Sequence, residues 1–141
     1  MNIHEKVQII VERFSRISDW ESKYKEMITL GKALPAFDET VRLDKFKVKG
    51  CQSQVWLVPT FKEGKIFFQA DSDSVLVKGI IALLLEVYSG ESPSDILITK
   101  ADFLTSIGLM ENLTMNRSNG LTSMIKQIQM YAMVFKTMEA K

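Results

Sequence analysis

Residues 75–87 form the longest apolar run in the chain, and Lys78 and Glu86 are its only charged members. A helix that spans a bilayer needs about 20 apolar residues, so this run is too short to cross a membrane. A helix that is apolar on nearly all sides is instead buried inside a protein. We therefore predict a core helix that begins near Ser74 and ends at Ser89 and Gly90, and the rest of the chain must cover it.

Amphipathic helices are predicted on both sides of this core helix. Apolar residues recur at steps of three and four near both ends of the chain. The first set is Ile3, Val7, Ile10, Phe14 and Ile17, and the last set is Leu121, Met124, Ile125, Ile128, Ala132 and Phe135. A second helix begins at Ser18, which has capping-box spacing with Glu21, and ends near Pro35. Ser92 and Thr99 are typical caps of two further short helices.

Three strands are predicted between the second helix and the core helix. Residues 45–49 alternate lysine with apolar residues at the period of two that is typical of a half-buried strand. Residues 54–61 form the second strand, and residues 65–70 the third, after a turn at Glu63 and Gly64. This order favours an α+β fold, a small three-stranded antiparallel sheet with helices packed against it. The length fits a single domain, residues 1–141.

Lys45, Lys47 and Lys49 project from one side of the first predicted strand. Lysines in such a position often protect an exposed sheet edge from pairing with another chain. The alternative is that they contact a partner protein beside the neighbouring cysteine. The sequence leaves both interpretations open.

The charge of the chain argues against several classes of function. With 18 basic and 17 acidic residues, its net charge of +1 gives no electrostatic reason to expect a nucleic-acid partner. The first residues run directly into a periodic helix and lack the basic segment, apolar stretch and cleavage site of a secretory signal. A single free cysteine fits a reducing compartment. We therefore expect a cytoplasmic protein with no membrane partner.

Cys51 is the only cysteine, and it lies in a loop between the first two predicted strands. The loop begins with Gly50, which permits backbone angles that other residues resist, and continues with Gln52, Ser53 and Gln54. A lone cysteine is often a small buried apolar residue. A loop of glycine, glutamine and serine is a poor place for such a residue, however, and its N–H and amide groups can stabilise a reactive thiolate.

The composition limits what this thiol can do. A hydrolytic cysteine needs a histidine base, and the only histidine is His4, near one end of the chain. An iron–sulfur cluster or a zinc site needs several ligands, and a thioredoxin-like site needs a second cysteine, so we expect no bound metal and no dithiol chemistry. Positive charge would stabilise the thiolate of Cys51. Lys49 is adjacent, and Lys78 and Arg117 are candidates if the fold brings them near.

Residues 48–56, with the sequence VKGCQSQVW, resemble the signature around the acceptor cysteine of the SufE family, the SufE/CsdE-like sulfur acceptor proteins of iron–sulfur cluster assembly. Residues 19–24, 30–35, 71–73, 77–79 and 113–121 also resemble that family, in the same order. The family often has proline where Met115 stands, a difference that weakens the start signal of the last helix but affects no proposed chemistry. The resemblance covers nearly the whole chain and implies the fold of SufE, shared with IscU-type iron–sulfur scaffolds.

The resemblance also implies a function. Cys51 would take persulfide sulfur from a pyridoxal-phosphate-dependent cysteine desulfurase of the SufS or CsdA type, stimulate that enzyme, and pass sulfur to an iron–sulfur scaffold protein. The chain would be a cosubstrate and activator rather than a stand-alone enzyme, and it would bind no cofactor itself. One thiolate is sufficient, because exchange at a persulfide needs a nucleophile, access and protection. We expect apolar neighbours to shelter Cys51 until the partner docks and the loop swings out.

The residues assigned to the loop and to partner contact are Gly50, Gln52, Ser53, Gln54, Asp73 and Arg117. Asp71 and Asp73 are expected to cap the core helix rather than to act as catalytic acids. Arg117 lies near the start of the last helix, where the helix dipole disfavours a cation. It is either in a surface ion pair or in a loop-anchoring or partner-contact role. Gly79, inside the core helix, indicates close packing against other backbone, for which the Cys51 loop is a candidate.

One rival function comes from a different class. In a noncatalytic redox-sensing or binding module, Cys51 would only be oxidised or modified. A carrier takes sulfur from a desulfurase and raises its turnover, whereas a sensor responds to peroxide without a partner.

Overall fold

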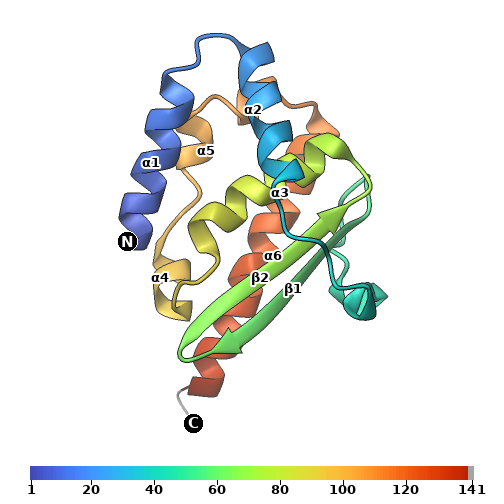
Figure 1. Ribbon diagram of the computed structural model, residues 1–141. Helices are drawn as coiled ribbons and strands as arrows, with labels where there is room; N and C mark the ends of the chain where they lie inside the picture. The colour runs from blue at the N-terminus through green and yellow to red at the C-terminus, as the bar shows by residue number, and fades with distance from the viewer. Residues whose placement is uncertain (140–141) are drawn as a thin grey trace.

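The computed structural model of the protein describes residues 1–139, which form helices and one β-hairpin (Figure 1). In chain order the elements are α1 (Ile3–Ser15), α2 (Trp20–Lys32), η1 (Glu39–Val41), η2 (Asp44–Phe46), β1 (Val55–Lys62), β2 (Lys65–Ser72), α3 (Val75–Tyr88), α4 (Pro93–Ile98), α5 (Phe103–Ser106), η3 (Met110–Asn112) and α6 (Met115–Glu139). The combination of helices with a small antiparallel sheet confirms the predicted α+β class. Within residues 1–139, no helix has the length and apolar character that a membrane span requires.

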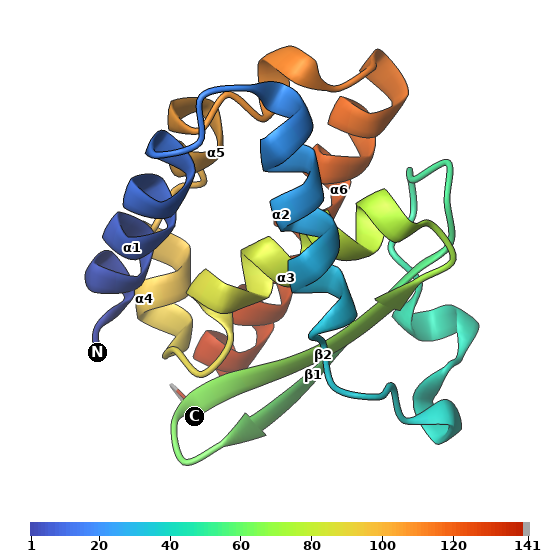
Figure 2. The same ribbon diagram turned by 45° about the horizontal axis from the view of Figure 1, so that its top comes forward.

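Helix α3 is the buried helix that the apolar run predicts. Its side chains Ile81, Leu83 and Leu84 have no exposed surface. Complete burial of one such side chain contributes about 1.5–3 kcal/mol, so α3 is the main apolar element of the core. Ser74 is its N-cap, because the Ser74 side chain accepts a hydrogen bond from the N–H of Val77. Helices α1, α2 and α6 and the hairpin surround α3 (Figures 1 and 2).

Helix α2 meets α3 at a contact between two glycines. A Cβ at Gly31 would lie 2.8 Å from the backbone nitrogen of Gly79, and a Cβ at Gly79 would overlap the carbonyl oxygen of Met27. This close approach explains why a residue that weakens helices occurs inside the core helix. The expected backbone contact at Gly79 is confirmed, but its partner is α2 and not the Cys51 loop.

Strands β1 and β2 pair antiparallel along their whole length, with Val55 opposite Ser72 at the open end. The tight turn at Glu63 and Gly64 lies where it was predicted, and both residues have positive φ, 53° and 78°. Two successive positive φ angles are typical of the type I′ turn, which matches the twist of the strands it joins.

Helix α6 packs against the hairpin. The hydroxyl of Tyr131 donates a hydrogen bond to the carbonyl oxygen of Leu57 at 3.3 Å. The rings of Phe61 and Phe135 stack with their centroids 4.9 Å apart. These contacts place the second half of α6 along β1 toward the tight turn, and the contact of Gly120 with Cys51 places the first half beside the loop that precedes β1.

The prediction of a third strand at residues 45–49 is wrong. Asp44–Phe46 form the short helix η2, whose hydrogen bonds use the backbone locally, and the N–H of Lys47 bonds to the Asp44 carbonyl at 3.0 Å. Only Lys47 forms a bridge, with Trp56, and Val48 adds one hydrogen bond to β1 at 2.8 Å. Val48 is buried, so the alternation of exposed and buried side chains is present, but pairing with β1 is limited to Lys47 and Val48 before the chain turns away. The sheet has two strands.

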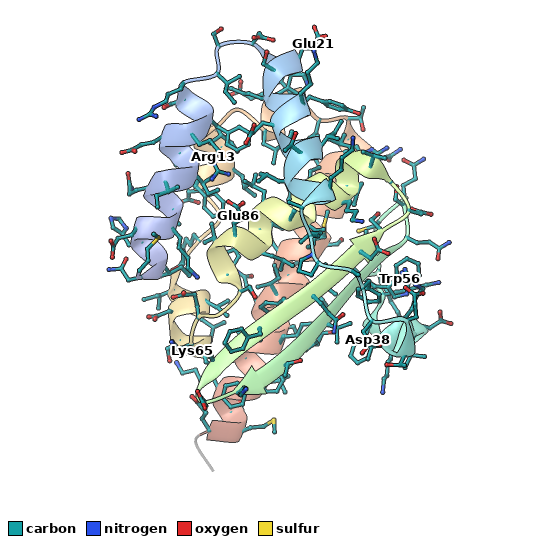
Figure 3. The ribbon with its side chains drawn as sticks, in the orientation of Figure 1. Arg13, Glu21, Asp38, Trp56, Lys65 and Glu86 are labelled. Atoms are coloured by element: carbon teal, nitrogen blue, oxygen red, sulfur yellow. The ribbon has the colours of Figure 1, made fainter. Side chains whose placement is uncertain are left out.

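Residues 33–54 lie at the end of the hairpin opposite its tight turn (teal in Figures 1 and 2). Figure 3 shows Trp56 beside this segment and Lys65 at the other end of the hairpin. The guanidinium of Arg42 lies over the indole ring of Trp56, 4.6 Å from its centroid, and forms an ion pair with Asp71 at 2.7 Å. These contacts attach the segment to the sheet and fix where the Cys51 loop begins.

Candidate functional site

The loop of residues 49–54 is closed at its base and pressed against α6. At the base, the N–H of Val48 donates to the carbonyl of Val55 at 2.8 Å. Gly50 has a φ of +90°, where residues with a β-carbon are strained. A Cβ at Gly50 would also lie 2.6 Å from the Oγ of Ser123 in α6. Glycine is therefore needed at this position both for its backbone angle and for the contact with α6.

Cys51 rests on the first half of α6. Its thiol donates a hydrogen bond to the carbonyl oxygen of Gly120, with Sγ and oxygen 3.5 Å apart. A Cβ at Gly120 would lie 3.5 Å from that sulfur and 3.8 Å from the Cα of Cys51, which are ordinary contact distances, so the loop lies close against the helix backbone. Cys51 is partly buried and packs against the hydrophobic core. The thiol is thus sheltered without being enclosed.

A small cavity lies beside the thiol, between the loop and the helices. Val77 and Ile80 of α3, Met124 of α6 and Arg117 contribute to its lining, together with Cys51. Its free volume is about 10 Å³, which is room for roughly one water molecule. The space next to the sulfur is therefore of atomic size and largely apolar.

Burial raises the pKa of the Cys51 thiol above its ordinary value. In this conformation the thiol is protonated at neutral pH. Two of the cations expected to counteract this are engaged elsewhere: Lys78 lies 3.4 Å from Asp71, and Arg117 binds Ser74. Because the thiolate is the nucleophilic form, burial makes Cys51 less reactive in this conformation.

Asp73 holds the outgoing end of the loop. Its Oδ1 accepts a hydrogen bond from the N–H of Gln54 at 3.0 Å, and the hydroxyl of Ser72 donates to the Gln54 carbonyl at 2.8 Å. The prediction that Asp71 and Asp73 cap the core helix is wrong, because Ser74 is the cap and Asp71 forms ion pairs. Asp73 contacts the loop, and it does so through the loop backbone.

Arg117 connects the start of α6 to the start of α3. Its Nη1 donates a hydrogen bond to the Oγ of Ser74 at 3.0 Å, and the same oxygen accepts the N–H of Val77. Within residues 1–139, Arg117 has no carboxylate at ion-pair distance, so the surface ion-pair interpretation is wrong. Arg117 also lines the cavity beside Cys51, and its loop-anchoring or partner-contact role stays a prediction.

Gln52 and Ser53 form the outer part of the loop. The side chain of Gln52 is exposed and that of Ser53 is half-buried. Gln52 also borders a shallow depression with Asn116 and Asn119 of α6. The loop and the start of α6 thus form one continuous surface, and contact of these residues with a partner stays a prediction.

Two residues beneath the loop, Gly120 and Ser123, were missed by the interpretation of the sequence. Gly120 did carry a usable signal, because a glycine inside a helix implies close packing, as it does at Gly79. Ser123 carried none, since serine is ordinary on a half-exposed helix face. Their contacts with the loop join positions about 70 residues apart in the chain.

The chemistry of the site centres on one thiol. The only histidine, His4, is in α1 and lines a different depression, with residues of α4 and α5. Among residues 1–139, no three histidine, cysteine, aspartate or glutamate side chains are arranged to hold a metal ion. A single thiol in a loop can act as a nucleophile toward sulfur without a base beside it.

Comparison with known proteins gives consistent matches. A family model described as "SufE: Fe-S metabolism associated domain" matches residues 8–132. An uncharacterized SufE-like protein of Rhizobium etli is 44% identical over 131 residues, covering 89% of this chain and 88% of that protein. The "SufE-like protein 1, chloroplastic/mitochondrial" of Arabidopsis thaliana is 39% identical over 129 residues, covering 91% of this chain but 35% of that longer protein.

A solved structure has the same fold. The solution structure of a hypothetical protein from Thermus thermophilus matches with a TM-score of 0.78 and 24% sequence identity. The match covers 94% of this chain and 96% of that one. At this identity the likeness concerns the arrangement of helices and hairpin alone.

Proposed function

This chain belongs to the SufE family, and on that premise we propose that Cys51 accepts a sulfur atom from a cysteine desulfurase and carries it toward iron–sulfur cluster assembly. The family description supports the coarser role, in iron–sulfur metabolism. The sulfur-carrier role is supported by the position of the Cys51 thiol. The thiol lies in a loop that begins with Gly50, contacts Gly120 of α6, and borders a cavity of atomic size.

The proposed transfer needs no external oxidant. The Cys51 thiolate attacks the outer sulfur of a persulfide on the desulfurase and forms a new S–S bond. The sulfur–sulfur bond of the donor breaks at the same time, and the donor cysteine leaves as a thiolate. Cys51 then carries the persulfide, and the same exchange in reverse sense delivers the outer sulfur to a recipient thiolate. Each step moves one sulfur atom between thiols, so no metal or base has to act.

The cavity beside Cys51 supports a protective role for the resting loop. A sulfur atom is slightly larger than a water molecule, so a space of about 10 Å³ accommodates the outer sulfur after a small outward shift of the loop. Val77, Ile80 and Met124 would then contribute apolar atoms around it, beside Ser53, Asn116 and Arg117, which also line the cavity. Such surroundings would keep water-borne thiols and oxidants away from the persulfide.

The raised pKa of Cys51 supports a gated reaction. A thiol that burial keeps protonated is a poor nucleophile until the loop leaves α6. A weak S–H···O contact, the Gly50–Ser123 packing and the apolar contact of Cys51 with the core hold the middle of the loop, while a hydrogen bond to Asp73 fixes its end at Gln54. The loop is thus built to move in the middle and stay attached at the ends. A docking desulfurase would supply the energy for that movement.

The remaining parts of the proposal concern the partners. The donor is a desulfurase of the SufS or CsdA type, which supplies its own pyridoxal phosphate, and the recipient is an iron–sulfur scaffold protein. This chain serves as cosubstrate and activator and binds no cofactor. A cytoplasmic location is expected from the free thiol. It is part of the proposal and not a finding, since the Arabidopsis relative is described as chloroplastic/mitochondrial.

The rival function, a peroxide sensor, receives less support from the site. Sensor cysteines are generally of low pKa and accessible to solvent. Cys51 is partly buried, and its pKa is raised.

Desulfurase turnover tests the proposal. The rate at which a cysteine desulfurase consumes cysteine would be measured alone, with the wild-type protein, and with the Cys51→Ser variant. We expect the wild type to raise the rate and the variant, equally folded, to leave it unchanged. Equal stimulation by both proteins would show that sulfur transfer to Cys51 is not the cause. Oxidation of Cys51 by peroxide without any effect on the desulfurase would favour the sensor.

A further inference from the structure

Four lysines line a groove next to the Cys51 loop. Lys45, Lys47 and Lys49 come from the segment before the loop, and Lys126 comes from α6. This lysine groove has a volume of about 450 Å³, and its remaining lining is uncharged. It is therefore a concave, strongly positive surface.

The charges in the lysine groove are largely uncompensated within the molecule. Lys45, Lys49 and Lys126 form no ion pair with any of residues 1–139. Lys47 lies 3.3 Å from Asp44, but the side chain of Asp44 is 95% exposed, and such pairs contribute little. The four ammonium groups thus repel one another unless an anion joins them.

Two of these lysines lie near aromatic rings. The Nζ of Lys47 lies 5.5 Å from the ring centroid of Trp56, and the Nζ of Lys45 lies 5.2 Å from that of Phe46. The interpretation that the lysines protect a sheet edge no longer applies, since residues 45–49 are not a strand. Their placement beside the loop favours the alternative, that they contact a partner protein.

The lysine groove is continuous with the site of Cys51. Ser123, which contacts Gly50 at the start of the loop, belongs to the groove. Lys45, Lys47 and Lys49 also border a larger cleft of about 620 Å³ that contains Cys51 itself. An occupant of the groove would therefore press on the contact that holds the loop against α6.

We propose that the lysine groove docks an acidic segment, with several carboxylates, on the surface of the sulfur-donor protein. This inference rests on the proposed function and specifies how the donor is recognised. Complementary charge speeds encounter and sets orientation, which suits a carrier that must bind and leave repeatedly. A compact acidic protein surface fits better than nucleic acid, because the chain as a whole has a net charge of only +1, whereas nucleic-acid-binding domains are typically strongly basic.

The test reverses two groove charges and compares the result with an equal change elsewhere. The groove variant is Lys49→Glu with Lys126→Glu, and the matched control is Lys65→Glu with Lys100→Glu; all four lysines are exposed. Lys65 is at the far end of the hairpin (Figure 3), and Lys100 lies between α4 and α5. The desulfurase used is one that charges the wild-type protein. The measured quantity is the carrier concentration that gives half-maximal stimulation, at low salt and at about 0.5 M salt.

At low salt, we expect the concentration that gives half-maximal stimulation to be about tenfold higher for the groove variant than for the wild type. This difference should shrink at high salt, because ions screen exposed charges. The control variant should match the wild type. As a check on the thiol itself, iodoacetamide should alkylate Cys51 at the same rate in the wild type and the control variant, and less than about tenfold more slowly in the groove variant, because Lys49 is adjacent to Cys51.

Three results would overturn the inference in distinguishable ways. Equal behaviour of groove and control variants would refute the lysine groove while sulfur transfer to Cys51 stands. Tight, salt-sensitive binding of a single-stranded oligonucleotide that only the groove variant loses, with unchanged desulfurase stimulation, would assign the groove to nucleic acid. Failure of every desulfurase to charge the wild type would reject the proposed function and this inference with it.

Discussion

The Sγ of Cys51 lies 3.5 Å from the carbonyl oxygen of Gly120, and a Cβ added at that glycine would lie 3.5 Å from the same sulfur. A β-carbon would therefore fit at Gly120 at ordinary contact distance, but it would occupy the space beside the sulfur. The same residue lines the cavity into which we place the outer sulfur. Gly120 is therefore central to the sheltered state of the thiol.

Gly120→Ala tests the use of that cavity. The new methyl group would make an ordinary contact, 3.5 Å from the sulfur, and alanine is favoured over glycine in a helix by about 1 kcal/mol. The variant should thus be at least as stable as the wild type in urea. It should nevertheless lose its outer sulfur to cyanide several-fold faster, because the methyl fills the space beside the thiol. An unchanged rate of sulfur loss would mean that the persulfide does not use the cavity.

Gly50→Ala should release the loop from α6. The φ of +90° and the 2.6 Å approach to the Oγ of Ser123 both oppose a β-carbon, and left-handed backbone alone costs about 1–2 kcal/mol. We expect a loss of stability of that order and faster alkylation of Cys51 by iodoacetamide. Adding Ser123→Ala removes the clash but not the backbone strain, so it should restore part of the wild-type rate. Slower alkylation in Gly50→Ala would contradict this account.

The pH dependence of stability should reveal the buried thiol. Because burial raises the pKa of Cys51 in the folded protein, the unfolded chain loses the thiol proton first as pH rises. The stability linked to Cys51 is present below the pKa of the unfolded thiol and is lost as pH rises through the folded pKa. The free energies of unfolding of the wild type and Cys51→Ser, measured in urea, should therefore depend differently on pH only in the alkaline range. A steeper alkaline loss in the variant would show that the folded pKa is not raised.

Gly79→Ala should destabilise the core, in contrast to Gly120→Ala. A Cβ at Gly79 would overlap the carbonyl oxygen of Met27, and a backbone atom cannot move aside cheaply. Overpacking typically costs about 1–3 kcal/mol, which outweighs the gain of about 1 kcal/mol in helix propensity. The urea midpoint of this variant should fall, and a midpoint equal to that of Gly120→Ala would refute the tight α2–α3 contact.

The helices and the hairpin could be predicted because their signals are local. The apolar run of α3, the stripe of α1 and the turn at Glu63 and Gly64 each fix one element through periodicity or turn chemistry. The third strand could not be judged in this way. Alternation at residues 45–49 reports which side chains are buried, but it does not say whether a partner strand continues or whether local hydrogen bonds at η2 use the backbone first.

The site was predictable in its centre and not in its surroundings. Cys51 could be singled out because it is the only thiol and lies in an unusual loop. The roles of Asp73 and Arg117 depend on contacts with Gln54 and Ser74, and the latter spans 43 residues of chain. Such contacts follow from how elements pack, and no pattern within either segment encodes them.

The mass of the intact chain after reaction with a cysteine desulfurase and cysteine, without reductant, tests the central claim most directly. The wild type should gain the mass of one sulfur atom, and the Cys51→Ser variant treated in parallel should gain none. A wild-type chain that stays at its original mass with every desulfurase tried, or a variant that gains the same sulfur, would contradict a carrier role for Cys51.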